Sequence, residues 1–71
     1  MEIDEYKKLV ADRITTRREA LGLSQRAFAK VINVLQPQVN RWETGNHLPD
    51  LYNAYWIAKG LNISMDELFR A

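Results

Sequence analysis

The sequence predicts an all-α protein, a compact five-helix bundle that forms a single domain over residues 1–71. Three observations support this prediction: apolar residues recur at helical spacing, capping residues precede these stretches, and no segment alternates as a strand does. At 71 residues the chain can bury one small core, and its 46% hydrophobic and 27% charged content is typical of a globular domain.

The first two helices are expected over residues 5–21 and from residue 25 to residue 32 or 33. The first ends before Gly22, which readily adopts the left-handed conformation of a helix stop. Ser24 is a suitable N-cap for the second helix, and Asn33 tolerates the left-handed turn after it. The apolar stripe of the first helix contains Tyr6, Leu9, Val10, Ile14, Ala20 and Leu21, and that of the second contains Phe28, Val31 and Ile32.

A third helix is expected to begin at Gln36 or Pro37, because proline fits only the first turn of a helix and pushes the residue before it out of the α region. Val39 and Trp42 are its inward positions, and Gly45 ends it.

The last two helices follow a loop that contains Pro49. Asp50 is expected to cap the fourth helix, and Gly60 and Asn62 to end it. Its apolar residues, expected to face inward, are Leu51, Ala54, Tyr55, Ala58 and Leu61. A capping-box pattern, Ser64 with Glu67, then opens a short fifth helix that carries Leu68 and Phe69.

The clearest motif covers residues 25–44: a short helix, a turn of three or four residues and a second short helix. The outward positions of the second helix are polar, and they are Gln36, Gln38, Asn40 and Arg41. Amide and guanidinium groups make paired hydrogen bonds with the edges of bases. The sequence therefore predicts a helix-turn-helix whose recognition helix is Gln36–Thr44.

Charge is unevenly distributed along a chain whose net charge is only +1. Residues 1–12 and 48–71 are net negative, whereas residues 13–47 carry a net charge of +4. The cations of that middle stretch are Arg13, Arg17, Arg18, Arg26, Lys30 and Arg41, set against Glu19 and Glu43. A face that binds a polyanion explains this pattern, and an ordinary solvated face explains it about as well.

The motif residues also resemble a family, the Cro/repressor-type (XRE) helix-turn-helix proteins. The resemblance is carried by Leu23-Ser24-Gln25, Phe28-Ala29, Val39-Asn40-Arg41-Trp42-Glu43-Thr44-Gly45 and Pro49. It continues through Leu51, Ala58, Leu61, Ile63-Ser64 and Asp66-Glu67-Leu68, so that it covers about residues 13–69. It implies a lambda repressor-like DNA-binding domain, usually dimeric, that regulates transcription in bacteria, phages or mobile elements.

The resemblance also implies roles for individual residues. Arg18 and Glu43 match a pair that links the first helix to the end of the recognition helix. Residues implied to contact bases are Gln36, Pro37, Gln38 and Arg41, and those implied to contact phosphates are Gln25, Arg26, Asn40, Thr44, Asn46 and His47. This chain departs from the family pattern at Asn33, where glycine is common, and at Leu35, where a small polar cap is common. Pro37 replaces a base-reading amide, so its expected contact is apolar, to a thymine methyl group.

A homodimer interface is expected on the outward face of the fourth helix, at Tyr52, Trp56 and Lys59. Large aromatic residues on an outward face are unusual for a small monomer and are enriched at interfaces. The alternative is that the N-terminal part of the first helix folds back over them through Ile3, Tyr6 or Val10.

The function expected is sequence-specific binding of double-stranded DNA at a palindromic operator by a transcriptional regulator, a repressor in preference to an activator. The alternative is a protein-interaction module, such as an antitoxin or accessory subunit. Catalysis is not expected, because no paired carboxylates, cysteine nucleophile or phosphate-binding loop is present. With no cysteine and one histidine, no metal is expected, and no other cofactor. No small-molecule substrate or membrane contact is expected either, and the expected location is the cytoplasm.

Overall fold

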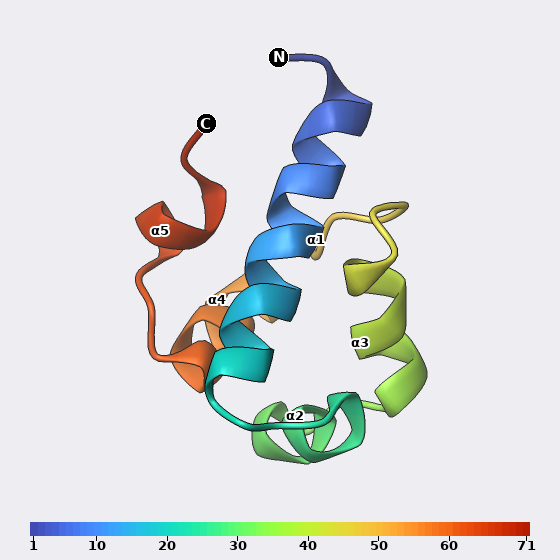
Figure 1. The fold of residues 1–71 in the computed structure, drawn as a ribbon, viewed down its shortest axis with the longest axis vertical. Helices are drawn as coiled ribbons and strands as arrows, with labels where there is room; N and C mark the ends of the chain where they lie inside the picture. Colours follow the sequence, from blue (N-terminus) through green and yellow to red (C-terminus); the bar gives the residue numbers. More distant parts are fainter.

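The computed structural model describes residues 1–71 and contains five helices and no strands, which confirms the predicted all-α fold. The helices are α1 (Ile3–Ala20), α2 (Gln25–Ile32), α3 (Gln36–Glu43), α4 (Leu51–Leu61) and α5 (Met65–Phe69). α1 runs through the middle of the molecule, with α3 on one side, α5 on the other and α2 across its C-terminal end (Figure 1). The helix-turn-helix therefore wraps around one end of a long central helix.

Capping residues set the ends of these helices where the sequence predicts them. Ser24, Asp50 and Ser64 each accept a hydrogen bond, 2.8–3.0 Å long, from the backbone N–H three residues further on. Asn33 and Asn62 follow α2 and α4 in the left-handed conformation, with φ of 60° and 58°. These local signals fix where the chain turns, so they place α2 and α3 before any long-range contact does.

A single apolar core joins α1 to the other helices. Its members are Val10, Ile14, Phe28, Ala29, Ile32, Val39, Trp42, Ile57, Ala58, Leu61 and Leu68. The helix-turn-helix contributes five of these residues, from Phe28 to Trp42. Both of its helices are therefore held by the core rather than by their own short hydrogen-bond ladders, which would be marginal alone.

The inward face of α4 differs from the prediction. Ile57 is fully buried beside Ala54, Ala58 and Leu61, whereas Leu51 and Tyr55 are exposed. A helix advances about 100° per residue, so a stripe through positions 54, 57, 58 and 61 turns position 55 to its flank. Two large apolar side chains predicted for the core thus lie on the surface.

Gly60 lies inside α4 and does not end it, contrary to the prediction. A Cβ atom at Gly60 would lie 2.6 Å from Ile32 Cγ2 and 3.0 Å from Phe28 Cε1. α4 therefore approaches α2 too closely for any side chain at this position. On α2, Phe28 and Ile32 point inward as predicted, but Val31 is exposed.

Arginines of α1 hold the C-terminal ends of two other helices. Arg17 Nε donates a hydrogen bond of 2.8 Å to the carbonyl of Leu61, at the end of α4. Arg13 donates to the carbonyls of Leu68 and Arg70, at the end of α5. A cation is favourable at a helix C-terminus, where the last carbonyls lack partners. These two cations of the positively charged stretch are therefore structural.

None of the five helices has both the length and the apolar character required to cross a membrane.

Candidate nucleic-acid interface

The turn between α2 and α3 is short and internally fixed. The left-handed Asn33 reverses the chain without the glycine that is common there, and the Val34 N–H bonds to the Ala29 carbonyl at 2.9 Å. Leu35, the N-cap of α3, has no capping side chain, but its N–H donates to Gln38 Oε1 at 3.1 Å. The Gln38 N–H, which a polar cap would bind, donates instead to the Leu35 carbonyl at 2.9 Å.

α3 buries one face and exposes the other. Val39 and Trp42 lie in the core, and the residues predicted to read bases lie outside it. Of these, Pro37, Gln38 and Arg41 are exposed and Gln36 is half-buried. The exposed face of the helix is therefore a row of amide and guanidinium groups with one proline.

An amide network joins the start of α2 to α3. Gln25 Oε1 accepts a hydrogen bond of 2.8 Å from Gln36 Nε2. Gln25 Nε2 donates to Glu43 Oε1 at 3.2 Å and to Asn40 Oδ1 at 3.5 Å. One glutamine thus touches the first, middle and last turns of α3. Its bond to Asn40 is the longest of the three and so the most easily exchanged for another partner.

Arg18 and Glu43 form a bidentate ion pair between α1 and α3. Arg18 Nε lies 2.7 Å from Glu43 Oε2, and Arg18 Nη2 lies 2.9 Å from Glu43 Oε1. Burial raises the pKa of Glu43, but hydrogen bonds from Arg18, Gln25 and Thr15 outweigh it and bring the pKa below its ordinary 4.5. The hydrogen bond to Glu43 raises the pKa of Arg18 despite the opposing effect of burial. Glu43 is therefore held as a carboxylate.

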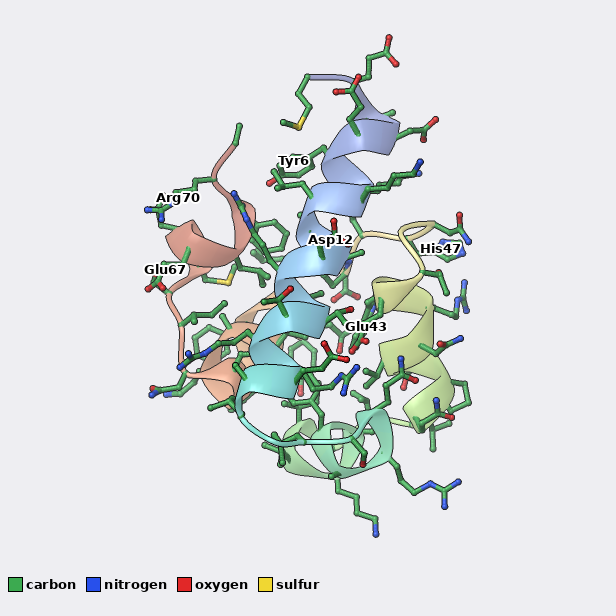
Figure 2. All side chains as sticks on the ribbon, viewed as in Figure 1. Tyr6, Asp12, Glu43, His47, Glu67 and Arg70 are labelled. Atoms are coloured by element: carbon green, nitrogen blue, oxygen red, sulfur yellow. The ribbon has the colours of Figure 1, made fainter.

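The loop after α3 carries three of the residues predicted to contact phosphates. Thr44 ends the helix, and its hydroxyl donates to the Arg41 carbonyl at 2.8 Å. Asn46 and His47 are exposed beyond it, and His47 Nε2 lies 3.4 Å from Arg41 Nη2. His47 lies on the α3 side of the molecule, away from α5 (Figure 2). Arg26, also predicted to contact phosphate, is exposed in the first turn of α2.

The outward side of α4 carries an aromatic face made of Leu51, Tyr52, Tyr55 and Trp56. Tyr52 is 72% exposed and Trp56 is 42% exposed. The ring of Trp56 meets those of Tyr52 and Tyr55 edge to face, with centroids 6.5 and 5.0 Å away. Lys59 Nζ lies 5.6 Å from the centroid of the Tyr55 ring.

The N-terminal part of α1 does not cover this aromatic face, so the alternative predicted for it is wrong. Val10 lies in the main core and Ile3 is exposed. Tyr6 donates a hydrogen bond to the carbonyl of Phe69, in α5. α1 continues as one helix from Ile3, which carries its first turns past the loop between α3 and α4 (Figure 1).

Comparison with known proteins identifies the family. Residues 14–68 match the Helix-turn-helix family HTH_3. The chain belongs to this helix-turn-helix family. Over 59 residues it is 32% identical to the cryptic phage CTXphi transcriptional repressor RstR of Vibrio cholerae. The matched region is 83% of this chain and 53% of the repressor. The chain thus spans about half the length of that relative.

Solved structures of helix-turn-helix regulators share the fold. The restriction-modification controller protein C.AhdI from Aeromonas hydrophila superposes with a TM-score of 0.87 and 28% identity, over 97% of this chain and 100% of that one. An HTH_3 family transcriptional regulator from Vibrio cholerae superposes with a TM-score of 0.85 and 26% identity, over 96% of this chain and 38% of that one. These relatives are named as a transcriptional repressor, a restriction-modification controller protein and a transcriptional regulator, which is the class of function that the sequence predicts.

Sequence reasoning missed three contributors to this region. Thr15 donates a 2.9 Å hydrogen bond to Glu43, but on the sequence it is one of several polar residues on α1. Tyr55 was assigned to the core rather than to the aromatic face. Lys8 approaches Gly45 from α1, and no local pattern connects residues so far apart in sequence.

Proposed function

We propose that this protein is a transcriptional repressor that binds operator DNA by inserting α3 into the major groove. One observation carries the proposal: the face of α3 opposite the core is made of side chains that pair with base edges. In a helix-turn-helix the second helix enters the major groove while the first crosses the backbone. A repressor of transcription acts where the chromosome is, and we accordingly assign it to the cytoplasm.

Base contacts are assigned to Gln36, Pro37, Gln38 and Arg41. Arg41 is exposed, so its guanidinium can reach guanine, and its side chain contacts that of His47. Gln36 donates one amide hydrogen to Gln25 and retains a donor and its carbonyl for adenine. Gln38 uses its carbonyl on the Leu35 N–H, so its amide nitrogen is the group left for DNA. Pro37 offers an apolar surface for a thymine methyl group.

Phosphate contacts are assigned to residues at the start of α2, within α3 and in the loop after α3. They are Gln25, Arg26, Asn40, Thr44, Asn46 and His47. Gln25 lies at the start of α2, where free backbone N–H groups also favour an anion. Loss of the 3.5 Å hydrogen bond from Gln25 Nε2 to Asn40 would free this amide group to donate to a phosphate. The hydrogen bond from Gln36 to Gln25 Oε1 would remain in place.

A homodimer on a palindromic operator is the assembly we propose, with Tyr52, Trp56 and Lys59 in the interface. The aromatic face supports it, since large exposed rings side by side are enriched at interfaces. Val31, Val34, Tyr52 and Trp56 also line one shallow groove between α2 and α4, so the apolar surface is continuous. Two recognition helices about 34 Å apart would enter successive major grooves.

Selection of bound duplexes from a random DNA pool tests the function directly. A two-fold symmetric consensus with half-sites about 10 base pairs apart is the expected result. A pool that is not enriched over one passed through a protein without DNA affinity would overturn the proposal. An enriched consensus without symmetry would retain DNA binding and reject the palindrome.

A further inference from the structure

The N-terminal part of α1 lies against the loop that follows α3. Gly45, with φ of +81°, turns the chain there, and a Cβ on it would lie 3.2 Å from Lys8 Cγ and 3.6 Å from Lys8 Cα. The aliphatic stem of Lys8 therefore rests on the loop between Thr44 and Asn46, two residues assigned above to phosphate contacts. Lys8 is exposed, so its ammonium group is accessible to solvent.

This ammonium group and that of Lys7 have no ion-pair partner. The salt bridges of the protein are Arg18–Glu43 and Asp66–Arg70. Lys7 and Lys8 instead line a recess with Asp4, Gly45 and Asn46, without an apolar side chain among them. Two lysines and one aspartate line the recess, so it has a net positive charge, and Asp4 makes no salt bridge with either lysine.

Few of the other cations are among the residues assigned to DNA contacts. Arg13 and Arg17 bind the ends of α5 and α4, and Arg18 is neutralised by Glu43. In the assigned interface only Arg26 and Arg41 remain as fixed positive charges. Binding to DNA depends strongly on cations placed at phosphates. The two free lysines beside the loop are therefore a large share of the available charge.

We propose that Lys8, with Lys7 beside it, binds the DNA backbone at a phosphate flanking the region read by α3, so that the first turns of α1 form a clamp on the flanking duplex. This inference rests on the proposed function. The first turns of α1 extend past the α3–α4 loop and its His47, which places the clamp outside the base-reading region (Figures 1 and 2). The clamp carries no sequence information, because it touches the backbone alone.

The test measures how affinity for the selected operator depends on salt. The variants are Lys8→Gln, which keeps the stem on Gly45 and removes the charge, and Lys8→Arg, which keeps the charge. Arg70→Gln is the matched control, because it removes one exposed charge on the opposite side of α1 from His47 (Figure 2). Each variant is titrated with operator and with a scrambled duplex at several salt concentrations, after circular dichroism has shown that it is folded.

Each phosphate contact contributes about 0.9 to the slope of log affinity against log salt. Lys8→Gln should therefore reduce the slope by about 0.9 per bound protomer, on operator and scrambled duplex alike. Between 50 and 200 mM salt this makes the loss of affinity about threefold smaller per protomer. Lys8→Arg and Arg70→Gln should keep the parent slope. A duplex trimmed to the base-reading region should abolish the difference between parent and Lys8→Gln.

The outcomes separate the clamp from the function. A parent protein that binds no DNA would reject the proposed function itself. A parent that binds its operator, with the same slope for Lys8→Gln and the parent, would reject the clamp alone. An equal loss of slope in Arg70→Gln would also reject it, because the effect would then come from net charge.

Discussion

Arg18 and Glu43 meet as two parallel hydrogen bonds of 2.7 and 2.9 Å, with side chains only 10% and 5% exposed. They join the last full turn of α1 to the last residue of α3. Because the same carboxylate accepts from Thr15 and Gln25, Glu43 links the end of α3 to both α1 and α2. The position of the C-terminal end of α3 therefore depends strongly on one largely buried ion pair.

Removal of either partner of this pair should be strongly destabilising. Glu43→Ala leaves the Arg18 guanidinium buried without its counter-charge, at a cost of about 3–5 kcal/mol. Arg18→Ala should cost a similar amount, and the double variant less than the sum. Urea unfolding of the four proteins measures the coupling. Asp66 and Arg70, an exposed pair on α5, serve as the control, with an expected coupling under about 1 kcal/mol. Independent effects at positions 18 and 43 would contradict this account.

Stability should fall at acid pH through Glu43. Its pKa is lower in the folded protein than the ordinary 4.5, so the folded state binds fewer protons there than the unfolded state. The stabilisation is complete above pH 4.5 and is lost as the pH falls through the folded-state pKa. Unfolding curves measured downward from pH 6 should show this loss in the parent and less of it in Glu43→Gln. Parallel pH profiles for both proteins would be inconsistent with it.

Gly60→Ala should destabilise the protein, although the same change inside most helices adds about 0.5–1 kcal/mol of stability. Here the new methyl group would meet Ile32 Cγ2 at 2.6 Å, and overpacking of this kind costs about 1–3 kcal/mol. Thermal unfolding decides the sign. In an Ile32→Ala background, which lacks that Cγ2 atom, the penalty should shrink. A stabilised Gly60→Ala variant would show that α2 and α4 are further apart.

Trp56→Glu should weaken self-association without unfolding the monomer. Trp56 is the centre of the aromatic face, and a carboxylate there would have to lose its hydration in a dimer interface. Thr16→Glu, an exposed site on α1, adds the same charge elsewhere. Sedimentation on and off operator DNA compares both with the parent. Unchanged dimerisation of Trp56→Glu would place the interface on another surface.

The sequence predicts those features that depend on neighbouring residues. The caps Ser24, Asp50 and Ser64 and the left-handed Asn33 act within a few residues, so their positions were predictable. The stripe of α4 was not, because Tyr55 and Ile57 are both apolar and only the packing partner decides which is buried. α4 packs against α1, α2 and α5, and two of these helices lie far from it in sequence.

Some residues of the candidate interface were likewise predictable from the sequence, and others were not. The polar face of α3 follows from its spacing, and the resemblance to a family supplied the Arg18–Glu43 pairing. The hydrogen bonds of Arg13 and Arg17 were not predictable, since a run of arginines on one helix reads equally well as a DNA-binding face. Local charge counting likewise treats Lys7 and Lys8 as part of an acidic segment. Their place beside Gly45 appears only once the chain is folded.

Base reading by α3 is tested most directly at Arg41. The measurement is the affinity of the parent and Arg41→Ala for the selected operator and for a scrambled duplex of equal length, at one salt concentration. The operator should lose about 1–3 kcal/mol and the scrambled duplex much less, with specificity relaxed at one base pair. Arg26→Ala, which removes an exposed residue assigned to a phosphate contact, should weaken both duplexes alike. An equal loss on operator and scrambled DNA for Arg41→Ala would contradict base reading by α3.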